Sequence, residues 1–324
     1  MQETRGKEDG FSIFVMLGVL TLLAVVAIGL QKTIAVDVRF TANLAQRARA
    51  ETIADGLTRL AVRHLVINVP AEGRSGPLRL DGVPLTCRIG NALASVAIIN
   101  TDGQINLNLA PQALLIRILG GIGLSDQEAA RQARDIIDFR APGDQSIDGG
   151  SKLASYIQAG LRHGPKSAPF QSVGELEQVI GMTPARMERL RPLVTVHSLT
   201  GVVSPGALSK PVAIALAGET AASTGDIDAL KASLALPGEF TAVRRSGRGQ
   251  TVLASNTYLV RAVVDLGGTA RFTREAVVEL TATKLDGARI RDWSERDPDL
   301  YGVAPAATDE IPPCLGGVLW LTPG

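Results

Sequence analysis

The sequence predicts an α+β protein with a long N-terminal helix, an antiparallel sheet and a large inserted all-α domain. Three observations lead to this prediction. A charge-free apolar run lies near the N-terminus, strand-like patterns lie on both sides of the middle of the chain, and short helices with glycine turns lie between them. The chain has 324 residues, which is enough for about two domains.

The apolar run is Phe11–Leu30, which contains no charged side chain. At 1.5 Å per residue, about 20 helical residues span roughly 30 Å, the thickness of the hydrocarbon core of a membrane. A single stretch in lipid satisfies its backbone groups as a helix. No small-x-small cleavage site follows, which disfavours a secretory signal peptide, whereas a simple signal anchor stays open.

The helix is predicted to continue past Lys32 to about residue 66, because apolar residues recur there at intervals of three to four. They are Ile34, Val38, Leu44, Ile53, Leu57, Leu60 and Leu65. Small residues that allow another helix to approach closely are Ala42, Ala45, Ala48, Ala50 and Ala54. Together with the apolar run, this segment predicts one transmembrane and amphipathic stem.

Strand-like runs follow at residues 84–89 and 93–100. Much later, residues 258–264 and 276–279 alternate apolar and polar side chains around a turn at Gly267-Gly268, which predicts a hairpin. One strand pair before about residue 104 and another after about residue 256 indicate a single sheet that a helical insertion interrupts.

The insertion contains a weak duplication, with "INLNLAPQALLIRILGGIGLSDQEAARQARDIIDFR" as the first unit and "FQSVGELEQVIGMTPARMERLRPLVTV" as the second. Each unit has a short apolar helix, a glycine-bearing turn and a second helix. The turns are Gly121-Ile122-Gly123 and Ile180-Gly181-Met182, and Ser125 with Glu128 fits a capping box. Each unit resembles a helix-hairpin-helix, a module that holds DNA phosphates on its turn amides.

Charge and composition disfavour DNA binding. Lys and Arg number 33 against 32 for Asp and Glu, and aromatic residues make up only 4% of the chain. Asp126 and Glu128 lie just after the first glycine turn, where carboxylates repel phosphate. We therefore expect compact helical packing, and keep a membrane-anchored DNA receptor for competence as the alternative function.

The N-terminus "MQETRGKEDGF" resembles a type IV prepilin signal, a short hydrophilic leader that ends in glycine before phenylalanine and an apolar helix. The resemblance implies that a prepilin peptidase cuts after Gly10 and that the new amine of Phe11 is methylated. Most such proteins carry glutamate at the fifth mature position, where this chain has Val15. An intramembrane carboxylate is costly without a partner, so Val15 indicates a subunit at a filament tip with no neighbour's amine to neutralise.

The segments "INLNLAP", "ARDIIDFRAPGD", "APFQSVGELEQVIGMTPARMERLRPLVTVHS" and "REAVVELTA" together resemble the K-class minor pseudopilins of the type II secretion system, also called the GspK family. The resemblance implies a pilin-like long helix and antiparallel sheet with an inserted helix-hairpin-helix or SAM-like domain. Leu109 departs from the expected threonine, and "GVVSPGALSKPVAIALAGETAASTGD" is poorly matched. The predicted parts are residues 1–10 as the prepilin leader, 11–66 as the stem, 67–104 plus 240–293 as the pilin-like α/β domain, 105–239 as the inserted helical domain and 294–324 as a loosely packed tail.

The same resemblance implies a function and partners. The protein would initiate or cap a pseudopilus tip for protein export across the outer membrane. It would be a single-pass inner-membrane protein with its C-terminal bulk in the periplasm. Its partners would be minor pseudopilins of the I and J classes, the major pseudopilin, prepilin peptidase and inner-membrane lipid, with no nucleic acid.

Calcium is the one cofactor that the resemblance suggests. Asp138, Asp144 and Asp148 lie in a Gly-rich loop, although their spacing does not match an EF-hand and a solvated loop is the plainer interpretation. A weaker second candidate is the acidic set Asp292, Glu295, Asp297 and Asp299.

No enzyme activity is predicted. The chain has neither a G-x-S-x-G elbow nor a P-loop. Asp135 and Asp138 are expected on an exposed helix face, and His64, His163 and His197 lie far apart in the sequence. The two cysteines, Cys87 and Cys314, allow either one disulfide or two unpaired thiols.

Overall fold

The computed structural model describes residues 8–68, 78–204, 207–217, 256–267, 270–281, 287–297 and 311–314, and within the first of these ranges it describes side chains at 13–26 and 40–67. These residues form helices and antiparallel strands, which confirms the predicted mixture of helix and sheet. Most of the predicted leader, the predicted domain boundary at 239/240 and most of the predicted tail lie outside the described residues.

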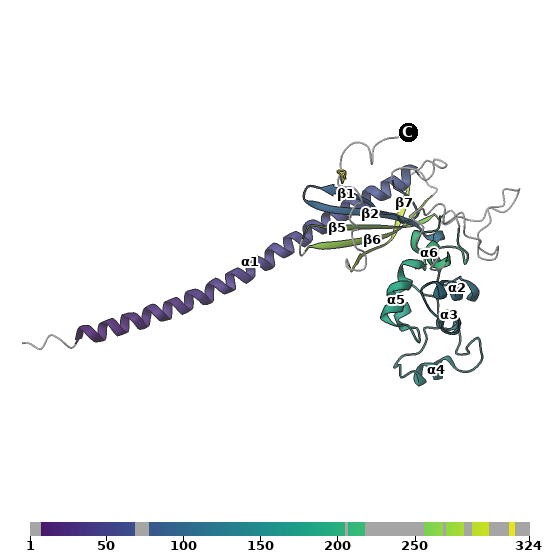
Figure 1. The fold of residues 1–324 in the computed structure, drawn as a ribbon, viewed down its shortest axis with the longest axis horizontal. Coiled ribbons are helices and arrows are strands. Elements are labelled where there is room, and N and C mark those ends of the chain that lie inside the picture. Colours follow the sequence, from purple (N-terminus) through teal and green to yellow (C-terminus); the bar gives the residue numbers. More distant parts are fainter. Residues whose placement is uncertain are drawn as a thin grey trace, which may run out of the picture.

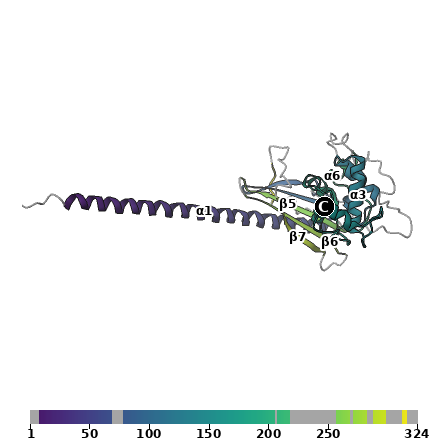
Figure 2. The ribbon, with the colours of Figure 1, turned by 90° about the horizontal axis from the view of Figure 1, so that it is seen from below.

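The N-terminal helix α1 (Glu8–Asn68) is a single helix of 61 residues, as predicted for the stem. Its N-terminal half projects away from the rest of the described chain, and its C-terminal part lies along the sheet (Figures 1 and 2). The predicted span Phe11–Leu30 is helical, with side chains 11, 12 and 27–30 outside the description. In the part of the chain that the structure describes, no helix is both long and apolar enough to cross a membrane.

The sheet has the order β1-β2-β5-β6-β7, and all of its neighbours are antiparallel. Its strands are β1 (Leu85–Ile89), β2 (Ala92–Asn100), β5 (Thr257–Asp265), β6 (Arg271–Leu280) and β7 (Ala288–Arg296). The pairing of β2 with β5 confirms that strands from both sides of the chain's middle form one sheet. The sequence did not predict β7, which continues past residue 293, where the sheet domain was expected to end.

One face of the sheet packs on the C-terminal part of α1 around Ala50, Ala54, Leu57, Ala61 and Leu65. Ala50 and Ala54 are fully buried there, which corrects part of one prediction: these two small residues let the protein's own sheet approach, not a second helix. On β6, Arg274 pairs with two carboxylates of α1, Glu51 at 2.8 Å and Asp55 at 2.6 Å. The helix is therefore fixed to the sheet by apolar contact and by charge.

Between β2 and β5, the described residues 101–204 and 207–217 form what we call the helical region, which has an apolar core of its own. A two-stranded parallel pair at its base joins Ile105 to Val194. Its elements are η1 (Thr101–Gly103), β3 (Ile105–Asn106), α2 (Gln112–Gly121), α3 (Asp126–Arg140), α4 (Lys152–Gln158), η2 (Val173–Gln178), α5 (Pro184–Leu190), η3 (Arg191–Leu193), β4 (Val194–Thr195) and α6 (Lys210–Ala217).

A disulfide joins Cys87 on β1 to Cys314, which decides between the two states that the sequence left open. Around it, the N–H of Arg88 donates to the carbonyl of Pro312 and the N–H of Cys314 donates to the carbonyl of Arg88, both at 2.9 Å. The expectation of a loosely packed tail is therefore wrong for residues 311–314, because they pair with the edge of the sheet.

Candidate functional site

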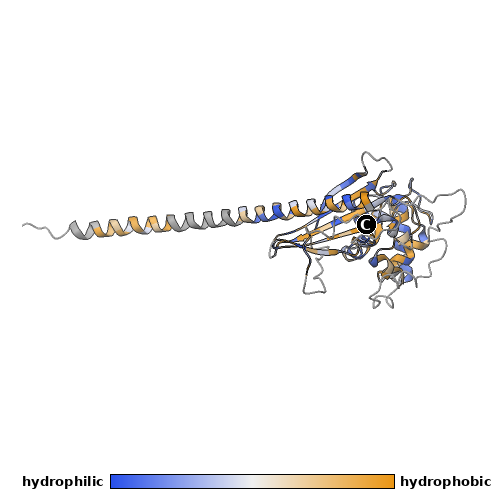
Figure 3. Cartoon of the chain, turned by 90° about the horizontal axis from the view of Figure 1, so that it is seen from above, coloured by the Kyte–Doolittle hydropathy of each residue, from blue (hydrophilic) through white to orange (hydrophobic). Residues whose placement is uncertain are grey.

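The projecting part of α1 carries a continuous run of exposed side chains, nearly all of them apolar. Between residues 13 and 26 every side chain is exposed, none is charged, and Phe14 is 76% exposed. Figure 3 shows the hydrophobic stretch near the N-terminal end of this helix. An apolar surface of this extent is stable only when lipid or other protein covers it.

The residues predicted for processing and for the tip lie at this end of α1. Gly10 and Phe11 are in the helix, and their side chains lie outside the described residues. Val15 is 50% exposed, so burial within the monomer does not explain why this position lacks a glutamate. Further along, Ala42, Ala45 and Ala48 are exposed and remain available for a neighbouring helix.

The helical region lies at the opposite end of the molecule from the projecting part of α1 (Figures 1 and 2). This position follows from the topology. Helix α1 ends at the far end of the sheet, and β2 ends and β5 begins at the same end, next to the helical region (Figure 1). The protein therefore has an apolar rod at one end and a bulky, separately packed unit at the other.

The first glycine turn of the helical region has no free amide for a ligand. The N–H groups of Gly123 and Leu124 donate to the carbonyls of Gly120 and Leu119 at 2.9 and 3.2 Å. Gly123 has a φ of +95°, which favours glycine. Because these donors are used inside the turn, they form no cradle for a DNA phosphate.

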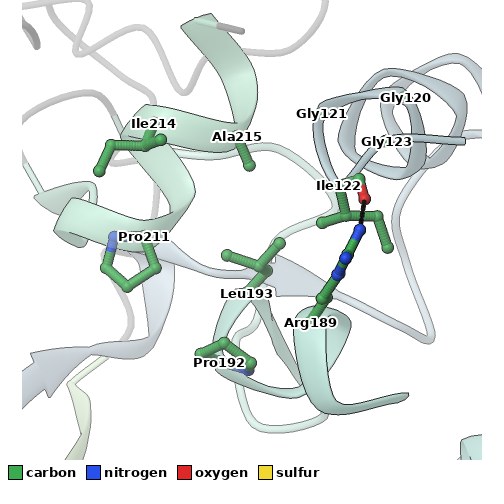
Figure 4. Close-up of a pocket in the computed structure, with 10 residues that line it drawn as sticks. All are labelled: Gly120, Gly121, Ile122, Gly123, Arg189, Pro192, Leu193, Pro211, Ile214 and Ala215. Carbon is green, nitrogen blue, oxygen red and sulfur yellow. Dashed lines mark hydrogen bonds between the residues drawn. The ribbon is translucent and has the colours of Figure 1, made fainter. Parts of the chain in front are cut away.

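Arginines of the second hairpin hold the first hairpin. Arg186 pairs with Glu128 at 2.7 Å and donates to the carbonyl of Gly181 at 3.0 Å. Arg189 donates to the carbonyl of Ile122 at 3.1 Å (Figure 4). The predicted capping box of Ser125 and Glu128 is present, and hydrogen bonds from Ser125 lower the pKa of the Glu128 carboxyl. The two hairpins therefore brace each other, as compact helical packing requires.

The three aspartates predicted for calcium each have protein partners. Asp138 accepts hydrogen bonds from the Ser146 hydroxyl and the Ile147 N–H, and Asp148 pairs with Arg134. Asp144 accepts from the Ser151 hydroxyl at 2.7 Å and the Leu153 N–H at 3.0 Å, and these bonds lower its pKa.

As arranged, these carboxylates do not converge on one point and do not fit a calcium ion. Across the described ranges, no three His, Cys, Asp or Glu side chains are grouped to hold a metal. Calcium binding by Asp138, Asp144 and Asp148 stays a prediction that requires their present contacts to break.

The side chains of the second acidic set make contacts that are separate from one another. Glu295 on β7 pairs with Arg47 of α1 at 2.7 Å, and Asp292 lies 3.8 Å from Arg296. Asp297 follows the strand, and Asp299 lies outside the described residues. Most of this segment belongs to the edge strand β7, which the sequence did not predict.

Asp135 and Asp138 were expected on an exposed helix face, but both are half-buried. Burial raises the pKa of the Asp135 carboxyl to about 6. On β6, Glu275 is 8% exposed between Arg261 and Arg296 and its pKa is lowered by these two guanidinium groups, which outweigh the opposite effect of burial. This ion-pair group was not predicted, although the adjacent charges Arg274 and Glu275 inside an apolar strand indicate it.

Comparison with known proteins finds one family model that matches about a third of the chain and a solved structure with a similar fold. Residues 91–198 match the family model described as type II secretion system (T2SS), protein K. No curated protein matches the chain. The fold is similar to a chain in the crystal structure of the GspK–GspI–GspJ complex of the type 2 secretion system of enterotoxigenic Escherichia coli, with a TM-score of 0.53 and 14% sequence identity over 80% of this chain and 99% of that chain.

Proposed function

We propose, on the premise that this chain belongs to the protein K family of the type II secretion system and is a minor pseudopilin, that it initiates or caps the tip of a pseudopilus. The proposed mechanism is assembly, without enzymatic activity. The projecting part of α1 would pack among other stems or in lipid, where its exposed apolar side chains lose their contact with water.

The observation that carries this proposal is the position of the helical region. It lies at the end of the molecule farthest from the projecting part of α1 (Figure 1). We interpret it as a domain inserted between β2 and β5. When α1 enters a bundle of stems, the helical region would occupy the space that the next subunit needs. Growth beyond this subunit would then be blocked.

Val15 supports the same position in the filament. The exposed stretch of α1 from residue 13 to 26 contains no carboxylate. A subunit inside the filament would need a carboxylate to neutralise the N-terminal amine of the subunit ahead of it, whereas a subunit at the tip has no subunit ahead. Valine at this position also avoids the cost of an unpaired carboxylate in lipid.

We further propose that the protein is anchored in the inner membrane by α1, with the bulk of the chain in the periplasm. The disulfide between Cys87 and Cys314 supports this orientation, because disulfides form in the periplasm and are rare in the cytosol. Prepilin peptidase would remove residues 1–10 first. The major pseudopilin would then contact α1, where Phe40 and Leu44 are exposed beside Ala45.

Minor pseudopilins of the I and J classes are the proposed tip partners. The solved chain to which this fold is similar was crystallised in a GspK–GspI–GspJ complex. We extend that assembly to this chain as part of the proposal.

Immunogold labelling tests the tip position. An epitope is placed in the loop at Gly149-Gly150, which is exposed, and pseudopili are overproduced in a host that carries the secretion system. We expect gold at one end of each pseudopilus. Gold along the whole length would contradict the proposal.

Processing provides a second test in the same host. Mass spectrometry should find Phe11 as the N-terminal residue, and Gly10→Val should leave an uncleaved chain that does not support secretion. A wild-type chain that keeps Met1 would contradict the proposed maturation. Gly18→Val, in the same helix and with nothing within 4 Å of its Cβ position, is the matched control and should be cleaved normally.

A further inference from the structure

A pocket of about 510 Å³ lies beside the first glycine turn of the helical region (Figure 4). One wall is the turn itself, Gly120–Gly123, and the other is the first part of α6, with Pro211 and Ile214. Pro192 and Leu193 of η3 form the floor between them. The volume lies within the usual range of ligand pockets, roughly 300–1,000 Å³.

The glycines create this pocket. A Cβ on Gly121 would lie 1.8 Å from the carbonyl oxygen of Ala215, so only glycine lets α2 approach α6 at this point. Gly120 is different, because its Cβ position has nothing within 4 Å. Because Gly120 lines the pocket and is exposed, a side chain at position 120 would extend into open space at the edge of the pocket, which we call its mouth.

Among the described residues that line the pocket, Arg189 is the only charged one. It is exposed, and within the described chain its one hydrogen bond goes to the carbonyl of Ile122. A guanidinium group has five N–H donors and binds carboxylates in a bidentate manner, so most of its capacity is unused. An apolar hollow next to an exposed cation is complementary to an apolar group that lies beside an anion.

We propose that this pocket binds a segment of a partner protein in which an apolar side chain of leucine or phenylalanine size lies next to a carboxylate. The apolar side chain enters between the glycine turn and Ile214, and the carboxylate pairs with Arg189. The turn amides are already used, so the anion is held by the side chain of Arg189 alone. The same glycine turn that offers no site for a phosphate thereby offers one for a peptide.

This binding does not depend on the tip function, because the pocket lies in the helical region, away from the projecting part of α1. A failure of peptide binding would leave the immunogold result intact, and a failure at the tip would leave peptide binding intact. The two proposals are therefore tested separately.

The experiment titrates full-length protein in lipid nanodiscs with three labelled nonapeptides, read by fluorescence anisotropy. Nanodiscs replace detergent because a detergent tail fits an apolar pocket. The peptides carry a central Leu-Asp, Leu-Asn or Ala-Asp pair in an otherwise Gly/Ser sequence. We expect the Leu-Asp peptide to bind about tenfold more tightly than either of the others. Equal binding of all three, or no binding of the Leu-Asp peptide, would overturn the proposal.

Two substitutions place the binding in this pocket. Gly120→Leu fills the mouth from an unstrained helical position and should weaken the Leu-Asp peptide about tenfold or more, whereas Gly120→Ala should change it less than about threefold. Arg189→Glu should abolish binding, and Arg162→Glu, an equal charge change at an exposed arginine elsewhere in the helical region, should not. Thermal unfolding confirms that each variant is folded. Equal binding by Gly120→Leu and Gly120→Ala would assign the peptide to another site.

Discussion

The sheet and the helical region use their cations in different ways. In the sheet the cations pair with carboxylates: Arg274 with Glu51 and Asp55, and Arg261 with Glu275 at 2.9 Å. In the helical region many cations donate to backbone carbonyls instead. Arg140 donates to Leu107 and Ala110, Arg189 to Ile122, Arg117 to Leu216 and the buried Lys152 to Ala141.

The difference follows from the backbone. Strands satisfy their own carbonyls in the ladder, so charged side chains in the sheet are left to neutralise each other. Each short helix leaves its last carbonyls without an intrahelical partner. In the helical region, Arg189, Lys152 and Arg117 reach such carbonyls at the ends of α2, α3 and α6. Arg140 instead reaches two carbonyls in the loop before α2. The cations of the sheet therefore form ion pairs, whereas the helical region combines ion pairs, such as Arg186 with Glu128, with hydrogen bonds from cations to carbonyls.

The largest expected effect tests the sheet alone. Replacing both Cys87 and Cys314 by serine frees residues 311–314 from β1 and should lower the stability of the sheet by about 2–5 kcal/mol. Hydrogen exchange should rise in β1 and β2 and stay unchanged in α2 and α3. The wild-type protein under reducing conditions is the matched comparison. Equal loss of protection in both regions would mean that they unfold as one unit.

The next effect tests the helical region. Arg140→Met keeps the length of the side chain but removes its bonds to the carbonyls of Leu107 and Ala110. A hydrogen bond from a charged donor contributes about 1.5–3 kcal/mol. Because the two bonds share one guanidinium group, their contributions are less than additive, and we expect a loss of about 2–4 kcal/mol. Hydrogen exchange should rise from β3 through α3, while the sheet keeps its protection.

Arg162→Met serves as the control for this change, because Arg162 is exposed and should tolerate the loss of charge. A response of the sheet to Arg140→Met, or none in the helical region, would refute the division between charge pairing and carbonyl capping.

Local sequence signals predicted the elements whose causes are local. The β5–β6 hairpin, the long α1 and the Ser125 capping box depend on neighbours within a few residues, and all three are present. Strand β7 was missed because it is an edge strand: Arg289, Ile290 and Arg291 are exposed in succession, so no alternation marks it.

Nonlocal contacts account for the other differences. Small residues at Ala50 and Ala54 suit a neighbouring stem and the protein's own sheet equally well, and only the fold decides between them. The sequence shows that Asp138, Asp144 and Asp148 lie close together in the chain, but not which way each side chain points. Hydrogen bonds orient Asp138 and Asp144, and Arg134 pairs with Asp148. The disulfide depended on residues 311–314 running beside β1, which no local pattern shows.

The smallest expected effect concerns a carboxylate that lacks the pairing found in the sheet. Burial raises the pKa of Asp135 to about 6 from an ordinary value of 3.8. The ionised form is therefore less favourable in the folded protein than in the unfolded chain. This rise in pKa corresponds to at most about 3 kcal/mol, and solvent screening of this half-buried group reduces that value. Asp135→Asn should therefore raise the free energy of unfolding by about 1–3 kcal/mol at pH 7.5.

This gain has a defined pH dependence. The cost of ionised Asp135 is complete above its folded-state pKa of about 6 and falls as the pH is lowered toward 3.8, where both states hold the proton. Urea unfolding from pH 7.5 down to pH 4 should therefore show the advantage of Asp135→Asn shrinking steadily. On the same helix, Asp138→Asn should destabilise the protein, because Asp138 accepts bonds from Ser146 and Ile147. If Asp135→Asn gave the same change at both ends of the pH range, its effect would come from packing and not from an unpaired buried charge.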